Sequence, residues 1–208
     1  MTTLSEPLWT PSDPTRTQTH HFREDINEKY SLNQKTYEDL YKWSINNRSD
    51  FWSSLFTYEN IIASCPPPSS SSTKVVDESA SPADNPPWFT GTSLNWAENQ
   101  LRHATSHPND VVIIQTSEPC SAHSPAPLKV TGKELLEMVG SVERQMRKSG
   151  VGKGDRVGWY GGNCLEAVVV LLATSAVGAV FSSAAADFGV DGVVERLQQV
   201  RQGSLLFS

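Results

Sequence analysis

The chain has 208 residues, of which 38% are hydrophobic, and a formal net charge of −6 at pH 7. This length and apolar content are enough for the core of one ordinary domain with a small addition. The acidic balance provides no basic field that would attract nucleic acid or anionic lipid, so we expect neither of them as a partner.

Targeting signals and cysteine pairs are not expected. Residues 1–20 lack the basic region and apolar run of a secretory signal. The longest apolar stretch, residues 165–181, is interrupted by Glu166 and predicts a buried helix, so no membrane span is expected. The chain has three cysteines, Cys65, Cys120 and Cys164. Their odd number and wide spacing indicate neither a disulfide framework nor a zinc site. A reducing, cytoplasmic setting fits this pattern best.

The N-terminal third predicts a small helical extension. Residues 1 to about 33 are polar and predict irregular or partly loose chain. From Thr36 the pattern changes, because Thr36 and Asp39 can form a capping box ahead of apolar residues at helical intervals. A second short helix is expected to begin near Ser49. We assign residues 1–64 to a partly helical N-terminal extension.

Beyond a linker, strands and helices alternate regularly. Residues 65–87 are dominated by proline, serine, aspartate and alanine and predict a linker or exposed loop. Strands are expected at 111–115, 128–130, 156–160, 179–182 and 204–207, and helices are expected to follow the caps at Thr131 and Asn163 and to begin near Val190. Such alternation predicts an α/β fold with a mostly parallel sheet, a β-α-β-α-β-α-β layer within residues 88–208. A chain that ends within its last strand predicts an incomplete domain.

Two glycine-rich segments invite a nucleotide-binding interpretation. Residues 150–155 follow a helix and precede a strand, whereas a phosphate loop follows a strand and opens a helix, so we predict a helix-to-strand turn there. Gly161 and Gly162 do lie between a strand and a helix and could let a ligand approach the backbone, although a tight loop is the default interpretation. The Ser/Thr-rich residues 69–74 contain no glycine and are assigned to the linker.

No residue is assigned as catalytic, cofactor-binding or metal-binding. The histidines show no pairing on a helical face and no carboxylate arrangement suited to a metal or to a nucleophile's base, so each is interpreted as solvated surface. They are His20, His21, His103, His107 and His123. Glu98 and Glu166 lie near expected helix starts, where capping is the better interpretation.

Several short motifs occur in constant order and resemble AMP-forming acyl-CoA synthetases of the acetoacetyl type. Residues 88–101, WFTGTSLNWAENQL, resemble the segment that begins the large domain of this family of adenylate-forming enzymes. Residues 133–136, KELL, resemble its first core motif, and residues 150–157, GVGKGDRV, continue the order. Residues 187–190, DFGV, followed by Arg196 and Gln199, resemble the segment that separates the acetoacetyl type from acetate-activating relatives.

The resemblance implies a two-step ligase reaction on a small-molecule acid. The family uses ATP with Mg²⁺ to form an acyl-adenylate, and CoA then displaces AMP. It implies that the chemistry belongs to a phosphate loop with its lysine, a Thr-Glu magnesium motif, an aspartate for the ribose and a lysine of a C-terminal domain. None of these occurs in this sequence, so no catalytic residue is carried over, and none of these cofactors is expected to bind well to this chain alone.

The sequence also departs from the family pattern. Gly132 stands where an aromatic residue is usual, Gly161 and Gly162 replace a Leu-Pro pair, and residues 184–186, AAA, replace a Cys-Ser-Pro-like triplet. These changes are expected to remove packing or rigidity, as in a decaying copy.

Three hypotheses follow from the sequence. The first is an N-terminal fragment of an acetoacetate–CoA ligase that is inactive alone. The second is a non-catalytic binding or regulatory module derived from such a synthetase. The third, a complete ligase, predicts acetoacetate-dependent exchange between ATP and pyrophosphate, which we do not expect. The oligomeric state and the identity of the acid stay open.

Overall fold

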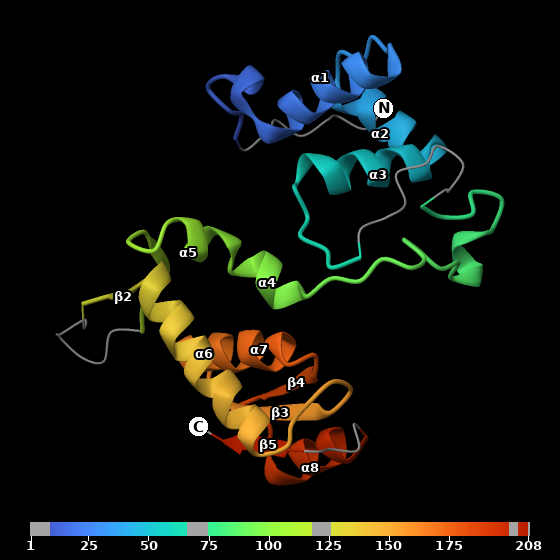
Figure 1. Ribbon diagram of the computed structural model, residues 1–208. Helices are drawn as coiled ribbons and strands as arrows, with labels where there is room; N and C mark the ends of the chain where they lie inside the picture. Colours follow the sequence, from blue (N-terminus) through green and yellow to red (C-terminus); the bar gives the residue numbers. More distant parts are fainter. Residues whose placement is uncertain (1–8, 66–74, 118–125, 200–203, 208) are drawn as a thin grey trace, which may run out of the picture. The chain divides into compact units, whose positions relative to one another are not determined.

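The structure is a computed structural model that describes residues 9–65, 75–117, 126–199 and 204–207 (Figure 1). The chain divides into two compact units, residues 1–94 and residues 95–208. None of the helices in these described ranges is long and apolar enough to cross a membrane.

The first unit is helical. Its elements are a 3-10 helix η1 (Pro14–Arg16), helices α1 (Gln18–Tyr30), α2 (Tyr37–Asn46) and α3 (Arg48–Tyr58), and a second 3-10 helix η2 (Pro82–Asp84). The predicted capping box is present at the start of α2, where the Asp39 carboxylate accepts the backbone N–H of Thr36 at 2.9 Å and the Thr36 hydroxyl accepts the N–H of Asp39 at 3.2 Å. Phe22, Ile26 and Leu40 form the buried centre of this unit.

The expectation of irregular chain up to about residue 33 is wrong for α1. Thr17 caps this helix, because its hydroxyl accepts the backbone N–H of His20 at 3.2 Å. Phe22 and Ile26 lie one turn apart and pack against Leu40, which gives the helix a buried face although the rest of it is polar. A tertiary contact therefore stabilises a segment whose composition alone favours loose chain.

The second half of the predicted linker packs against α3. Residues 66–74 lie outside the described residues, but Val75 and Val76 are buried. The backbone N–H of Val75 donates to the Ser49 hydroxyl at 2.7 Å, and the Glu78 carboxylate accepts the N–H of Ser49 at 2.9 Å. These contacts tie the segment after residue 74 to the first turn of α3. The predicted boundaries at 64 and 87 stay predictions.

The second unit contains the predicted alternation of strands and helices. Its elements are α4 (Trp96–Gln100), α5 (Arg102–Ser106), β1 (Val111–Gln115), β2 (Leu128–Thr131), α6 (Gly132–Lys148), β3 (Arg156–Gly161), α7 (Leu165–Ala176), β4 (Val180–Ala185), α8 (Val190–Gln199) and β5 (Ser204–Phe207). Strands β4, β3 and β5 form a parallel sheet in that order, so the α/β prediction is confirmed. Strands β1 and β2 instead pair antiparallel in a sheet of their own.

Helices cover both faces of the parallel sheet. In Figure 1, α6 and α7 lie on one side of it and α8 lies on the other. Side chains alternate along β3. Val157 and Trp159 belong to the core that includes α6 and α7, whereas Tyr160 packs against the buried cluster that includes Val193 and Leu197 of α8. The sheet is thus the middle layer of the unit.

Gly132 is a packing requirement, which corrects the expectation that it removes packing. It is buried, and a Cβ at this position would lie 2.9 Å from both the Cα and the carbonyl oxygen of Ala104. These are backbone atoms, so they cannot move aside as a flexible side chain would. A glycine here lets the first turn of α6 approach α5, and no larger residue fits without a shift.

Candidate functional site

The described residues place a cavity at the carboxyl ends of the parallel strands. Strands β3 and β4 pair in register from Arg156 with Val180 to Gly161 with Ala185, so both end at the same edge of the sheet. Ligands of open α/β sheets bind at this edge. The cavity has a volume of about 570 Å³ and is lined by the end of β3, the loop with Gly161 and Gly162, the first turns of α7, and β4 with the turn after it.

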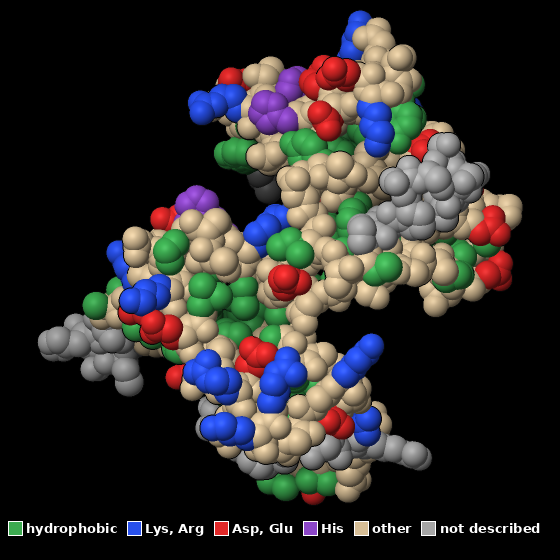
Figure 2. All heavy atoms as spheres, in the orientation of Figure 1, with side chains coloured by type: hydrophobic (Ala, Val, Ile, Leu, Met, Phe, Trp, Pro, Cys, Tyr) green, Lys and Arg blue, Asp and Glu red, His purple; other side chains and the backbone are tan. Residues whose placement is uncertain are grey.

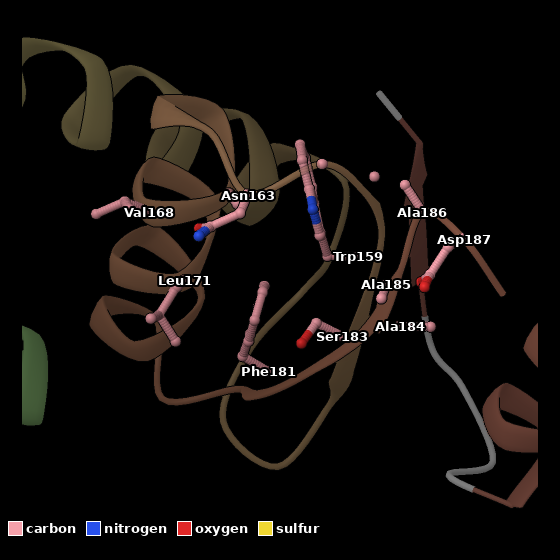
Figure 3. A pocket seen from close by; sticks show the side chains of 13 residues that line it. Trp159, Asn163, Val168, Leu171, Phe181, Ser183, Ala184, Ala185, Ala186 and Asp187 are labelled. Atoms are coloured by element: carbon pink, nitrogen blue, oxygen red, sulfur yellow. The ribbon is translucent and has the colours of Figure 1, made fainter. Parts of the chain in front are cut away.

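The walls of the cavity are mainly apolar. Figure 3 shows Phe181 between Leu171 of α7 and Ser183 of β4, while the ring of Trp159 stands between Asn163 and the strand that carries Ala184 and Ala185. Trp159 exposes only 5% of its surface. Its indole nitrogen Nε1 is buried and has no hydrogen-bond partner among the described residues.

The amino end of α7 borders this cavity but is not an anion site. Its first amide is already bonded, since Gln115 Oε1 accepts the backbone N–H of Leu165 at 2.6 Å. Hydrogen bonds to the Glu166 carboxylate from its own backbone N–H and then from the Cys164 thiol lower the pKa of this side chain below its ordinary value of 4.5. The Glu166 carboxylate therefore already places a negative charge at the positive end of the helix dipole. Among the described lining residues, the charged side chain is that of Asp187, and none is lysine or arginine.

The glycine segments differ in their roles. Gly150 and Gly154 have φ values of +84° and +88°, and the Asp155 carboxylate accepts the N–H of Gly152 at 2.8 Å, so residues 150–155 form the predicted helix-to-strand turn. Gly161 and Gly162 line the cavity instead, and a Cβ at Gly162 would meet nothing within 4 Å. Of the two interpretations of this pair, the structure favours the one that leaves room for a ligand.

Two of the histidines stack on each other at the surface, where both are exposed as predicted. The rings of His103 and His107 stack with centroids 4.6 Å apart, and His103 Nε2 lies 3.2 Å from the Asp110 carboxylate. The turn that follows α5 brings these residues together at the exposed surface. Within the described part of the chain, however, no group of three or more histidine, cysteine, aspartate or glutamate side chains is arranged to hold a metal ion.

Two other cavities have mainly apolar linings and are weaker candidates for a functional site. One of about 340 Å³ in the first unit is lined largely by aromatic and aliphatic side chains of α3 and of residues 88–94. Another of about 410 Å³ lies beside α7 in the second unit and is lined by Val112, Leu172 and other apolar residues. Figure 2 shows hydrophobic side chains gathered at the surface over α4 and α7 in this second unit. The cavity at the strand ends is therefore the best candidate site.

Comparison with known proteins identifies relatives along nearly the whole chain. The family described as AMP-binding enzyme matches residues 71–206, and the family described as acetyl-coenzyme A synthetase N-terminus matches residues 37–100. Acetoacetyl-CoA synthetase of Gallus gallus is 38% identical over 204 residues, and that of Macaca fascicularis is 39% identical over 201 residues.

The match covers a limited part of each relative. It spans 98% of this chain but 29% of the Gallus gallus protein, and 97% of this chain but 28% of the Macaca fascicularis protein. The solved acetoacetyl-CoA synthetase from Streptomyces lividans has a TM-score of 0.82 and 31% identity over 97% of this chain and 30% of its own. The chain thus spans about three tenths of the length of these relatives.

Proposed function

Because the chain belongs to the AMP-binding enzyme family, we propose that it is the N-terminal portion of an acetoacetate–CoA ligase. The observation that carries the proposal is the continuous similarity to acetoacetyl-CoA synthetases over 98% of the chain. The similarity extends through the segment 88–101 and the parallel strands, which supports a contribution of this chain to the first layer of the large domain.

In the proposed reaction, a carboxylate oxygen of acetoacetate attacks the α-phosphorus of ATP. A carbon–oxygen–phosphorus anhydride forms and pyrophosphate leaves. The sulfur of CoA then attacks the activated carbonyl carbon, the thiol loses its proton, and AMP leaves with the electrons of the broken bond. ATP, CoA and the acid are substrates of the whole ligase, and the family resemblance implies Mg²⁺ as its metal.

We propose that this chain alone does not catalyse the reaction. Within the described residues no group of three or more histidine, cysteine, aspartate or glutamate side chains is arranged to hold a metal ion, and the cavity at the strand ends has no lysine or arginine in its described lining to hold a triphosphate. We therefore assign no step of the mechanism to a residue of this chain. Its proposed contribution is to hold the strands and helices against which the rest of the ligase packs.

A chimera tests the proposed function. In it, this chain replaces the matching 204 residues of the Gallus gallus enzyme. We expect the chimera to form acetoacetyl-CoA from ATP, acetoacetate and CoA, and to prefer acetoacetate to acetate. The chain alone is expected to show no acetoacetate-dependent exchange between ATP and pyrophosphate. A folded chimera with no ligase activity would contradict the proposal and favour a non-catalytic module, whereas exchange by the chain alone would show that it is catalytic by itself.

A further inference from the structure

We propose that the first unit binds the alkylated ammonium group of a small organic cation, of which choline is an example. The site is the cavity of about 340 Å³ beside the end of α3, called the aromatic pocket from here on. Its lining includes four aromatic rings and one carboxylate, which belong to Trp52, Phe56, Trp88, Phe89 and Glu59. The inference goes beyond the ligase function, since it concerns a binding site in the first unit and can be tested without catalysis.

The aromatic rings of the pocket are accessible and lie at different angles. The rings of Trp52 and Trp88 are nearly perpendicular, at 78° with centroids 5.9 Å apart, and each residue exposes about two fifths of its surface, 42% and 40%. The rings of Phe56 and Phe89 have centroids 5.4 Å apart and an angle of 36°. Several rings around one cavity form the kind of aromatic cage that attracts a cation to the negative faces of the rings, and tryptophan attracts it most strongly.

The charge of the pocket also favours a cation. Glu59 is the charged residue of the described lining, which contains no lysine or arginine. Helix α3 ends at Tyr58 beside the pocket, and its last turn carries no basic residue. The carboxyl end of a helix bears a partial negative charge that stabilises a nearby cation. An anionic ligand would meet a carboxylate and the negative end of a helix dipole.

The backbone at the end of α3 favours an alkylated ammonium ion over a primary one. The carbonyl oxygen of Leu55 accepts the N–H of Glu59 at 2.9 Å, and that of Phe56 accepts the N–H of Ile61 at 3.2 Å. A primary ammonium group has three N–H donors that need acceptors when it leaves water. A quaternary ammonium group has none, so apolar and aromatic walls can replace its hydration shell without leaving a donor unpaired.

The backbone of Phe89 holds one wall of the pocket in an unusual conformation. Its φ is +47°, a left-handed value that is rare for a bulky side chain. Its N–H donates to the carbonyl oxygen of Val75 at 2.8 Å, and its own carbonyl oxygen accepts the N–H of Thr92 at 2.9 Å. Strained residues that are fixed in this way cluster at ligand sites. The cavity volume is at the lower end of small-molecule sites, which fits a ligand of the size of choline.

The test compares two probes of equal shape. Choline carries the charge, and neohexyl alcohol has a carbon atom in place of the choline nitrogen. Each is titrated into the whole chain at constant ionic strength and followed by calorimetry, while NMR of the ¹⁵N-labelled chain reports on the indole N–H signals. We expect choline to bind about two- to thirtyfold more tightly than the alcohol. Choline should shift the signals of Trp52 and Trp88, which are identified by their absence from Trp52→Leu and Trp88→Leu.

Variants separate the rings and the carboxylate from the apolar lining. Trp88→Leu keeps an apolar side chain without the ring, so we expect the preference for choline to shrink while neohexyl alcohol binds as before. Glu59→Gln should weaken the binding of choline and leave that of the alcohol unchanged. Trp9→Leu is the matched control, because Trp9 lies outside the lining and exposes 77% of its surface, and it should leave both affinities unchanged.

Four results would overturn the proposal. These are equal affinity for choline and neohexyl alcohol in the unchanged chain, no binding of either, an undiminished preference for choline in Trp88→Leu, or tighter binding of a peptide with trimethylated lysine than of choline. The last result would assign the cation to a polypeptide. The first two use the unchanged chain and hold even if a variant does not fold. None of these results alters the ligase activity of the chimera, so the two proposals fail independently.

Discussion

Gln115, the last residue of β1, caps the helix that begins at Leu165. Its Oε1 accepts the backbone N–H of Leu165 at 2.6 Å. The expectation that Asn163 caps this helix is wrong, because the N-cap residue is Cys164 and it makes no side-chain capping bond. The bond to Gln115 joins the antiparallel β1–β2 sheet to the helix that follows β3. A residue fifty positions away in sequence performs the role that a local cap usually has.

Replacing this distant cap is expected to destabilise the second unit. Gln115→Ala leaves the Leu165 N–H without its partner, and we expect a loss of about 1 kcal/mol in the free energy of unfolding. Urea denaturation measures the loss, and hydrogen exchange at the Leu165 amide should accelerate. Gln145→Ala, at an exposed position on α6, is the matched control and should change neither quantity. An unchanged exchange rate in Gln115→Ala would show that this bond does not protect the helix start.

Two glycines of the same helix should respond in opposite directions to alanine. Gly132→Ala places a Cβ 2.9 Å from backbone atoms of Ala104, so we expect a loss of about 1–3 kcal/mol in stability. In Gly140→Ala, the nearest atom is the Arg144 guanidinium nitrogen at 3.3 Å, which can move, so the better helix former should stabilise α6 by about 0.5–1 kcal/mol. Thermal unfolding of the two variants gives the comparison. Equal stabilities would mean that α6 can shift away from α5.

Replacing Asn95 by aspartate is expected to lower the stability of the second unit, although both residue types are good N-caps. Its Oδ1 accepts the N–H of Glu98 at the start of α4, while its Nδ2 donates to the carbonyl oxygens of Ser175 and Ala176 at the end of α7, at 3.3 and 3.1 Å. Asn95→Asp keeps the first role but places a negative charge against the negative end of a helix dipole. We expect it to cost about 1–3 kcal/mol in the free energy of unfolding.

The control for this position is Asn95→Ser, which keeps an uncharged N-cap acceptor. We expect Asn95→Ser to be the more stable of the two in chemical denaturation, because it brings no charge to the carbonyls of α7. If Asn95→Asp proves as stable as the unchanged chain, the contact with α7 contributes little and the cap of α4 dominates.

The capping box of α6 gives a defined pH dependence. Hydrogen bonds from the backbone N–H of Thr131 and then from its hydroxyl lower the pKa of Glu134 below its ordinary value of 4.5. A lowered pKa in the folded state means that the stabilisation is complete above pH 4.5 and is lost as the pH falls through the folded-state pKa. The stability difference between the unchanged chain and Glu134→Gln should therefore shrink on acidification. Glu137→Gln, which removes a charge from the same helix outside the box, should not reproduce this pH profile.

Local signals in the sequence were sufficient for most elements of the second unit. The strand runs, the Thr131–Glu134 capping box and the glycine turn at residues 150–155 depend on neighbouring residues, and each is present where it was predicted. The family followed from short motifs in constant order, and the comparisons confirmed it. Helix α1 was missed because its stability comes from burial of Phe22 and Ile26, which composition does not reveal.

The candidate site could not be predicted from the sequence, because tertiary packing decides which of its residues are buried and which meet. Gly161 and Gly162 marked the right loop, but nothing local showed that the buried Trp159 would line a cavity at the ends of β3 and β4. Sequence patterns also left open that β1 and β2 would pair in a separate antiparallel sheet. They predicted that Gly132 removes packing, whereas the structure requires a small residue there.

The sequence by itself thus determined the order of the strands and helices from β1 onward, the capping boxes at Thr36 and Thr131, the turn at residues 150–155 and the family, because these depend on residues a few positions apart. Only the tertiary structure decided which strands are neighbours, why Gly132 must be small, and which side chains meet at the strand ends. Those properties depend on atoms that are distant along the chain and are brought together only by packing of the layers.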